Sequence, residues 1–88
     1  MNRLHRRRQI RALDRRVGAL IREIRRRHGD TLTEAAEVLG VTYQQMQKYE
    51  SGSNRISAIA LCVLLKHWNE PVDGFVGRLT LEMVDLDD

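Results

Sequence analysis

Residues 36–52, with the sequence AEVLGVTYQQMQKYESG, decide the fold of this 88-residue chain. Within them, Thr42 is followed three residues later by Gln45, which is the spacing of a capping box in which a helix begins just after the threonine. Gly52 stands where a helix commonly ends on a residue of left-handed conformation. The stretch therefore predicts a short helix that begins at Tyr43 and stops at Gly52.

This helix is expected to have two unlike faces. Met46 and Tyr49 are three residues apart, so they share the face that we expect to turn toward the core. The opposite surface carries the polar side chains Gln44, Gln45, Gln47 and Lys48. The helix is thus predicted to be anchored on one side and polar on the other.

A second short helix precedes it. Thr31 and Glu34 form another capping box, and an apolar stripe follows before Gly40, so a helix is predicted over residues 32–39. Two short helices joined by a tight turn, the second with a polar outer face, are typical of a helix-turn-helix, whose second helix enters the major groove of DNA. The start of that helix also presents free backbone amides, which suit a phosphate.

Upstream, an apolar stripe at helical spacing predicts an amphipathic helix that ends near His28. The stripe consists of Val17, Leu20, Ile21 and Ile24. The start of this helix stays open at this stage. Either it begins near Arg7, or Asp14 caps it and residues 1–13 form a flexible arm.

Downstream, Ser57 caps a fourth helix that runs to about Trp68 and is apolar nearly all round, so it is expected to be central and buried. Pro71 suits the first turn of a brief fifth helix near residues 72–76. Residues 78–84 alternate with period two, which leaves open a strand-like tail.

Composition agrees with an all-α fold. The chain contains one proline and few aromatic residues (5%), and the side chains that favour strands are scarce. We expect a five-helix domain over residues 14–76. An Arg-rich arm or helix extension at 1–13 precedes it, and an acidic tail at 77–88 follows it, either paired as a strand or used in dimerisation.

Charge is unevenly distributed along the chain. Residues 1–28 hold eleven arginines against two carboxylates, a net charge of +9, whereas residues 71–88 hold one arginine against five carboxylates, a net charge of −4. A dense arginine cluster on a small domain favours a polyanionic partner, most often a nucleic acid. The arm arginines expected to contact DNA are Arg3, Arg6, Arg7, Arg8 and Arg11. If this segment is flexible, we expect it to lie along phosphates or to enter an adjacent minor groove. If it is helical, it is alternatively a surface for a partner protein.

The sequence argues against an enzyme, a metalloprotein and an exported protein. Cys62 is a single cysteine, expected in the core, and the three histidines match no zinc-ligand spacing. We find no Ser-His-Asp set, glycine-rich phosphate loop or carboxylate pair, and no apolar run long enough for a membrane. We therefore expect no catalytic residue, no metal, no cofactor and no small-molecule substrate, and we expect a cytoplasmic protein associated with the nucleoid.

Two stretches together resemble a known family. Residues 17–29 and 36–52, with the motif Leu39-Gly-Val-Thr42 and, after seven residues, Glu50-Ser-Gly52, are similar to the phage repressor and Cro-type helix-turn-helix family, also called the xenobiotic-response-element family. The resemblance implies a five-helix domain that binds double-stranded DNA and regulates transcription. It further implies a homodimer on a two-fold operator, acting most often as a repressor.

The resemblance also assigns site residues. The base-reading positions match Tyr43 and Gln44, with a further one at Gln47 or Lys48, and glutamine and lysine can pair with adenine and guanine respectively. The expected contacts to the DNA backbone are Thr42, Ser53, Asn54 and Arg55. The chain departs from the family at Leu32, where a glutamine often contacts a phosphate. Thr31, Thr33 or the arm are candidate replacements.

Two further roles follow from the resemblance. Glu50 matches a glutamate that pairs with a basic residue of the first helix, here Arg25, which implies a structural ion pair. The candidate dimer interface is Leu79, Leu81 and Met83. A rival hypothesis is an antitoxin-like module that binds a protein through its acidic tail, but the polar face of residues 43–52 argues against a purely protein-binding role.

Overall fold

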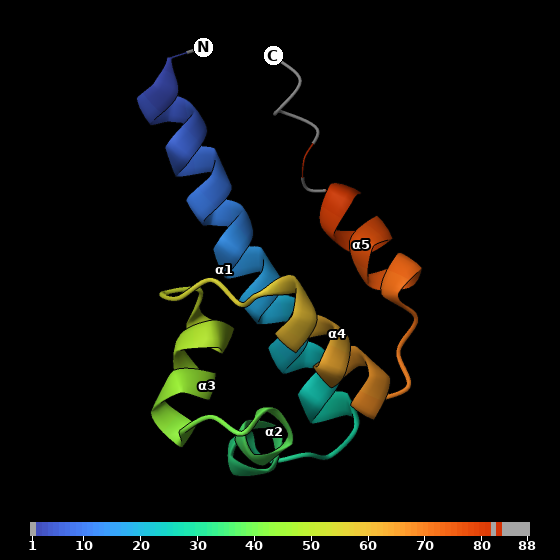
Figure 1. The fold of residues 1–88 in the computed structure, drawn as a ribbon. Helices are drawn as coiled ribbons and strands as arrows, with labels where there is room; N and C mark the ends of the chain where they lie inside the picture. Colours follow the sequence, from blue (N-terminus) through green and yellow to red (C-terminus); the bar gives the residue numbers. More distant parts are fainter. Residues whose placement is uncertain (1, 82, 84–88) are drawn as a thin grey trace.

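The computed structural model describes residues 2–81 and 83, and this part of the chain folds into five helices. They are α1 (Arg3–Arg27), α2 (Leu32–Leu39), α3 (Tyr43–Ser51), α4 (Ala58–His67) and α5 (Val72–Leu81). Figure 1 shows α1 as a long rod whose C-terminal half lies behind α4 and between α3 and α5, while its N-terminal half rises past α2 and α3. The all-α, five-helix fold predicted from the sequence is confirmed, and no strand occurs among the residues that the structure describes.

The helix boundaries are set by local capping. The hydroxyl oxygens of Thr31, Thr42 and Ser57 each accept a hydrogen bond from the backbone amide three residues later, at 3.0 to 3.1 Å. These bonds satisfy amides that have no partner inside the helix. Gly40 and Gly52 follow the helices with φ of 68° and 77°, a conformation that favours glycine. Caps and glycines together fix the length of the turn between α2 and α3.

The core is formed by side chains from all five helices. It contains Leu20, Ile21, Ile24, Ala35, Ala36, Met46, Ile56, Leu64, Leu65, Trp68 and Phe75. Tyr49 packs against this cluster as a partly buried side chain, as expected from its place on the inner face of α3. Because α3 buries Met46 and half-buries Tyr49, its opposite face is left outside.

At the N-terminus the structure decides between the two alternatives. The α1 helix begins at Arg3, and the Asn2 side chain caps it by accepting a 2.8 Å hydrogen bond from the amide of His5. The helical alternative is therefore right, although the helix begins at Arg3 rather than near Arg7. The prediction of a flexible arm is wrong, and Asp14 lies inside the helix rather than at its cap. Residues 3–17 contain no glycine or proline to interrupt the helix. The cap at Asn2 then stabilises its first turn.

The prediction that α4 is buried all round is also wrong. Leu64 and Leu65 are buried, but Ile59 is 79% exposed, Val63 is 43% exposed, and Cys62 is exposed rather than in the core. The helix packs one face on α2 and its neighbours, and in the described part of the chain no further element covers the other face. An apolar composition alone could not reveal how many neighbours the helix has.

At the other end, α5 continues beyond the predicted 72–76 to Leu81. Residues 78–81 are therefore helical rather than strand-like, and the rest of the predicted strand reaches positions 82 and 84, which lie outside the described residues. The helix is prolonged because Phe75 is buried and Leu79, one turn later, packs on the same core. Arg78 also pairs with Glu23 of α1 at 2.6 Å. The alternating polarity of residues 78–84 does not outweigh these long-range contacts.

Candidate nucleic-acid interface

The outer face of α3 presents the side chains expected to read DNA. Gln44, Gln47 and Lys48 are exposed, and Tyr43, the first residue of the helix, is 47% exposed. Gln45 is half-buried, and its amide is capped by Thr42. The face is thus a set of amide, ammonium and phenol groups on a helix whose inner face is fixed in the core.

Gly18 brings α1 into close contact with the C-terminal turn of α3. A side chain at this position would collide with the backbone carbonyl oxygens of Tyr49 and Glu50. The backbones of the two helices therefore touch directly, which only glycine permits.

A partly buried ion pair fixes the orientation of α3. Arg25 on α1 donates from Nε to Glu50 Oε2 at 2.7 Å and from Nη2 to Oε1 at 3.1 Å, and the two side chains are only 11% and 7% exposed. The third contact, from Nη1 to the carbonyl oxygen of Asp30 at 2.8 Å, ties in the loop before α2. The hydrogen bonds to Glu50 raise the pKa of Arg25. This α1–α3 ion pair holds both helices of the helix-turn-helix on one scaffold.

The residues expected at the DNA backbone lie at the rims of the same surface. Thr31, Thr33, Thr42, Ser53 and Asn54 are exposed. The two capping hydroxyls use an oxygen lone pair to accept an amide hydrogen bond, so the O–H of each is still able to donate to a phosphate. Ser53 and Asn54 sit in a loop tied back to α3, since the Asn54 amide donates to the Lys48 carbonyl oxygen at 3.2 Å.

Arg55 is joined to α1 in the structure. It donates from Nε and Nη2 to the two carboxylate oxygens of Asp14 at 2.9 and 3.0 Å. The hydrogen bonds with this carboxylate raise the pKa of Arg55. The guanidinium has five N–H donors, so it keeps further donors for a phosphate while it stays paired. The pair also shows that α1 passes directly beside the loop after α3.

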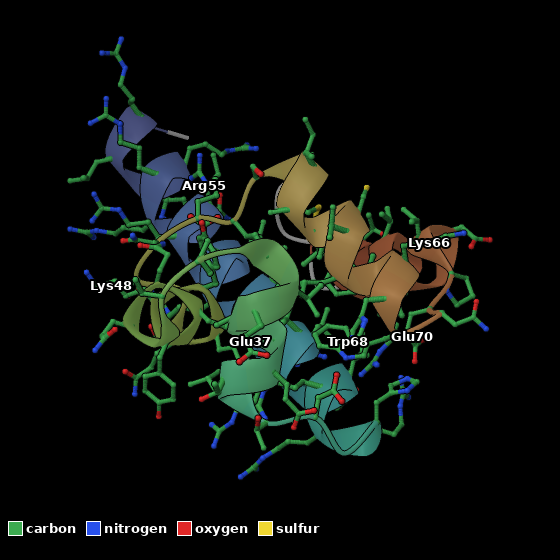
Figure 2. The ribbon with its side chains drawn as sticks, turned by 60° about the horizontal axis from the view of Figure 1, so that its bottom comes forward. Glu37, Lys48, Arg55, Lys66, Trp68 and Glu70 are labelled. Atoms are coloured by element: carbon green, nitrogen blue, oxygen red, sulfur yellow. The ribbon has the colours of Figure 1, made fainter. Side chains whose placement is uncertain are left out.

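The direction of the arm arginines follows from the phase of α1. Arg11, Gly18 and Arg25 are seven residues apart, so they share the face that packs on α3, and Arg7 lies one turn before Arg11. Arg6 instead follows the phase of Ile24 and is half-buried. Figure 2 shows nitrogen-tipped side chains along the N-terminal part of α1, on the same side of the molecule as Lys48. Arg3, Arg7, Arg8 and Arg11 are exposed there.

The candidate dimer residues are not equally accessible. Leu81 is 75% exposed, Met83 is half-buried in a turn, and Leu79 packs against the core. Other large apolar side chains are also exposed, namely Ile59 and Val63 on α4 and Val72 and Val76 on α5. The exposed apolar surface is therefore broader than the sequence pattern indicated, and it includes α4.

A polar cluster that sequence reasoning missed joins the α1–α2 loop to the α4–α5 loop. Asp30 accepts from Trp68 Nε1 at 2.8 Å and lies 3.0 Å from His67 Nε2, and the indole hydrogen bond, followed by the imidazole, lowers the pKa of Asp30. Glu70 Oε1 accepts a hydrogen bond from Arg27 Nη2 and lies 3.1 Å from His28 Nε2. The hydrogen bond with the imidazole lowers the pKa of Glu70. No signal in the sequence pairs residues about forty positions apart, so only the fold reveals this cluster.

Comparison with known proteins identifies the class. The helix-turn-helix family matches residues 21–75, which contain α2, α3 and α4. The chain belongs to this family, in its phage repressor and Cro-type form, as the sequence motif predicted.

Individual relatives carry related names. The chain is 41% identical over 63 residues to an uncharacterized HTH-type transcriptional regulator of Sinorhizobium medicae, covering 72% of this chain and 45% of that protein. A regulator of the same description from Rickettsia conorii is 36% identical over 66 residues, covering 75% and 53%. An uncharacterized transcriptional regulator in the ATPase CF(0) region of Rhodospirillum rubrum is 39% identical over 72 residues, covering 82% and 67%.

The chain spans about half the length of the first two relatives. No solved structure matches it significantly. Within the described residues, none of the helices combines the length and apolarity that a bilayer crossing needs, and no cluster of three or more His, Cys, Asp or Glu is placed to hold a metal ion.

Proposed function

We propose that this protein binds double-stranded DNA at specific sequences and thereby regulates transcription. The observation that carries the proposal is the exposed polar face of α3, held in a fixed orientation by the α1–α3 ion pair and by the close contact at Gly18. A helix presented in this way fits the major groove, where the pattern of donors and acceptors differs for each base pair. The names of the relatives support the same function.

In this proposal the polar groups have separate roles. Gln44 makes the main base contact, because it is exposed and lies in the first turn of α3, and Tyr43, Gln47 and Lys48 flank it. The groups assigned to the phosphates are Thr31, Thr33, Thr42, Ser53, Asn54 and Arg55. Phosphate contacts position the protein on the duplex, whereas base contacts select the sequence.

The N-terminal half of α1 adds affinity without specificity. It extends about 17 Å from Asp14 to Arg3, since a helix rises 1.5 Å per residue, and it leaves the body beside the loop that carries Arg55. Arg3, Arg7, Arg8 and Arg11 then contact phosphates that flank the site, while Arg6, half-buried on another face, contributes less. Each neutralised phosphate adds to the salt dependence of binding.

We further propose that two copies bind a two-fold operator and repress transcription by occupying a promoter on the nucleoid, in the cytoplasm. Dimerisation is supported by the exposed apolar side chains of α4 and α5, including Ile59, Val63 and Leu81. Sedimentation of the protein with and without operator tests this step, because a mass of one chain under both conditions contradicts the dimer.

Selection from a random pool of double-stranded DNA at near-physiological salt tests the function itself. We expect enrichment of a two-fold site with half-sites about 10–10.5 base pairs apart. Retention of DNA without enrichment of any sequence contradicts base reading by α3 and leaves a binder driven by arginine. Absence of retention contradicts DNA binding altogether.

One observation favours a second function. The exposed apolar residues of α4, among them Ile59, Cys62 and Val63, are suited to contact a protein. An antitoxin-like module of this kind would bind its partner through α4 or the acidic tail. It becomes the preferred function if the selection retains no DNA.

A further inference from the structure

A hollow on the outer surface joins the first residues of α2 and α3. Leu32 opens α2 and Tyr43 opens α3, and both line the hollow together with Gln47 of α3 and Arg22 of α1. The α1–α3 ion pair lines the same hollow. Since the start of α3 and its outer face are the parts proposed to enter the major groove, the edge of a base is the natural occupant of this hollow.

The lining of the hollow is mixed: Arg22, Gln47 and Ser51 contribute polar side chains, and Leu32 and Tyr43 form its apolar side. The guanidinium of Arg25 already donates to Glu50 and to the Asp30 carbonyl oxygen, so the ion pair has few donors to offer a base. Leu32 has no polar group and is only half-buried, and Tyr43 is 47% exposed. A base edge on this side of the hollow therefore meets the methyl groups of Leu32 and the aromatic ring of Tyr43.

We propose that Leu32 and Tyr43 together contact the 5-methyl group of a thymine, which makes Leu32 a further specificity-determining residue. Among the base edges in the major groove, thymine alone carries a methyl group. Because the leucine side chain cannot donate a hydrogen bond, it is unable to anchor a phosphate as a glutamine at this position would, and an apolar contact is the interaction left to this side chain. This inference rests on the proposed function, since it requires α3 to lie in the major groove.

The test uses the operator obtained by selection. Each thymine is replaced in turn by deoxyuridine, which removes the methyl group and leaves every hydrogen-bonding group in place. We expect an affinity loss of about fourfold at one thymine in each half-site, the size expected for one buried methyl group. Smaller effects are expected at the other thymines.

Two variants assign the contact to the proposed pair. In Leu32→Ala and in Tyr43→Ala, the ratio of affinities for the thymine and deoxyuridine operators should fall toward one. Leu32 packs partly on the core, so Tyr43→Ala provides the test should Leu32→Ala unfold. The matched control is Leu4→Ala, which truncates an exposed apolar side chain on α1 that has no proposed contact and should keep the fourfold ratio.

The outcomes separate this inference from the proposed function. An operator that lacks thymine, or that tolerates deoxyuridine at every position, overturns the thymine contact while sequence-specific binding stands. A methyl effect that survives in both variants overturns the assignment to Leu32 and Tyr43. Failure to select any sequence overturns the proposed function, and the thymine contact with it.

Discussion

The α3 helix and the N-terminal half of α1 are both polar and both proposed to contact DNA, but the fold treats them differently. The nine residues of α3 are capped at the start, ended by a glycine, and held by the buried Met46 and the α1–α3 ion pair. The N-terminal half of α1 rises past α2 and α3 with Arg3, Arg7, Arg8 and Arg11 exposed. A helix held in a fixed orientation can discriminate between bases, whereas a row of exposed arginines binds phosphates whatever the DNA sequence.

The largest expected effect comes from breaking the contact that fixes α3. Glu50→Ala leaves the Arg25 guanidinium largely buried without its carboxylate, so we expect a loss of about 3 kcal/mol in the free energy of unfolding, measured by urea titration. Specific DNA binding should fall with it. Glu37→Ala, at an exposed position of α2, is the control and should change stability by less than about 0.5 kcal/mol. A Glu50→Ala protein as stable as the control would show that packing alone fixes α3.

The next largest effect is expected at Gln44, the residue of α3 proposed to make the main base contact. Gln44→Ala removes an amide that can pair with two atoms of an adenine, which contributes about 1–3 kcal/mol of discrimination. We expect at least about fivefold weaker binding to the selected operator and unchanged binding to a scrambled duplex, measured by fluorescence anisotropy. Equal losses on both duplexes would mean that Gln44 acts on the backbone rather than on a base.

The arginines in the N-terminal half of α1 predict a smaller effect, on the salt dependence of binding rather than on its sequence specificity. Replacing Arg7 and Arg11 together by glutamine should reduce the salt slope of binding by about 1.8, because each lost phosphate contact contributes about 0.9. The ratio of operator to scrambled affinity should stay the same. Lys66→Gln also removes a positive charge but lies on α4, far from Lys48 in Figure 2, and should leave the slope unchanged. An unchanged slope in the double variant would place the arm off the DNA.

The two regions also differ in how well the sequence predicted them. The helix-turn-helix could be predicted because the signals that start and end its helices are local. The caps at Thr31 and Thr42 each bond to an amide three residues later, and Gly40 and Gly52 each end a helix through their own backbone conformation. The start of α1 depended on one cap at Asn2, which competes with an equally plausible one at Asp14.

Elements whose ends depend on distant contacts were predicted poorly. The burial of α4 and the length of α5 depend on which helices lie beside them, and the partners of Phe75 and Arg78 are far away in the sequence. At the candidate site, the motif indicated the outward side chains of α3. It could not indicate that Arg55 pairs with Asp14, or that Leu32 and Tyr43 share a hollow, because both depend on how α1, α2 and α3 pack.

The smallest expected effect concerns the polar cluster around Asp30, which joins the α1–α2 loop to the α4–α5 loop. Hydrogen bonds from Trp68 and His67 lower the pKa of Asp30 in the folded protein. A lowered pKa means that the charged form contributes stability above the unfolded-state pKa of an aspartate, about 3.9, and that this contribution is lost as the pH falls through the lower folded-state value.

Asp30→Asn keeps an acceptor for the indole but removes the charge. Its melting temperature should therefore lie below that of the unmodified protein from about pH 5 to pH 7, and the gap should close below about pH 4. Glu37→Gln, on the exposed surface of α2, should show no such gap. A gap that stayed constant down to pH 3 would mean that the amide geometry, and not the charge of Asp30, stabilises the junction of the two loops. Because Arg25 also donates to the carbonyl oxygen of Asp30, the measurement also shows whether the scaffold behind α3 depends on the charge of the Asp30 side chain.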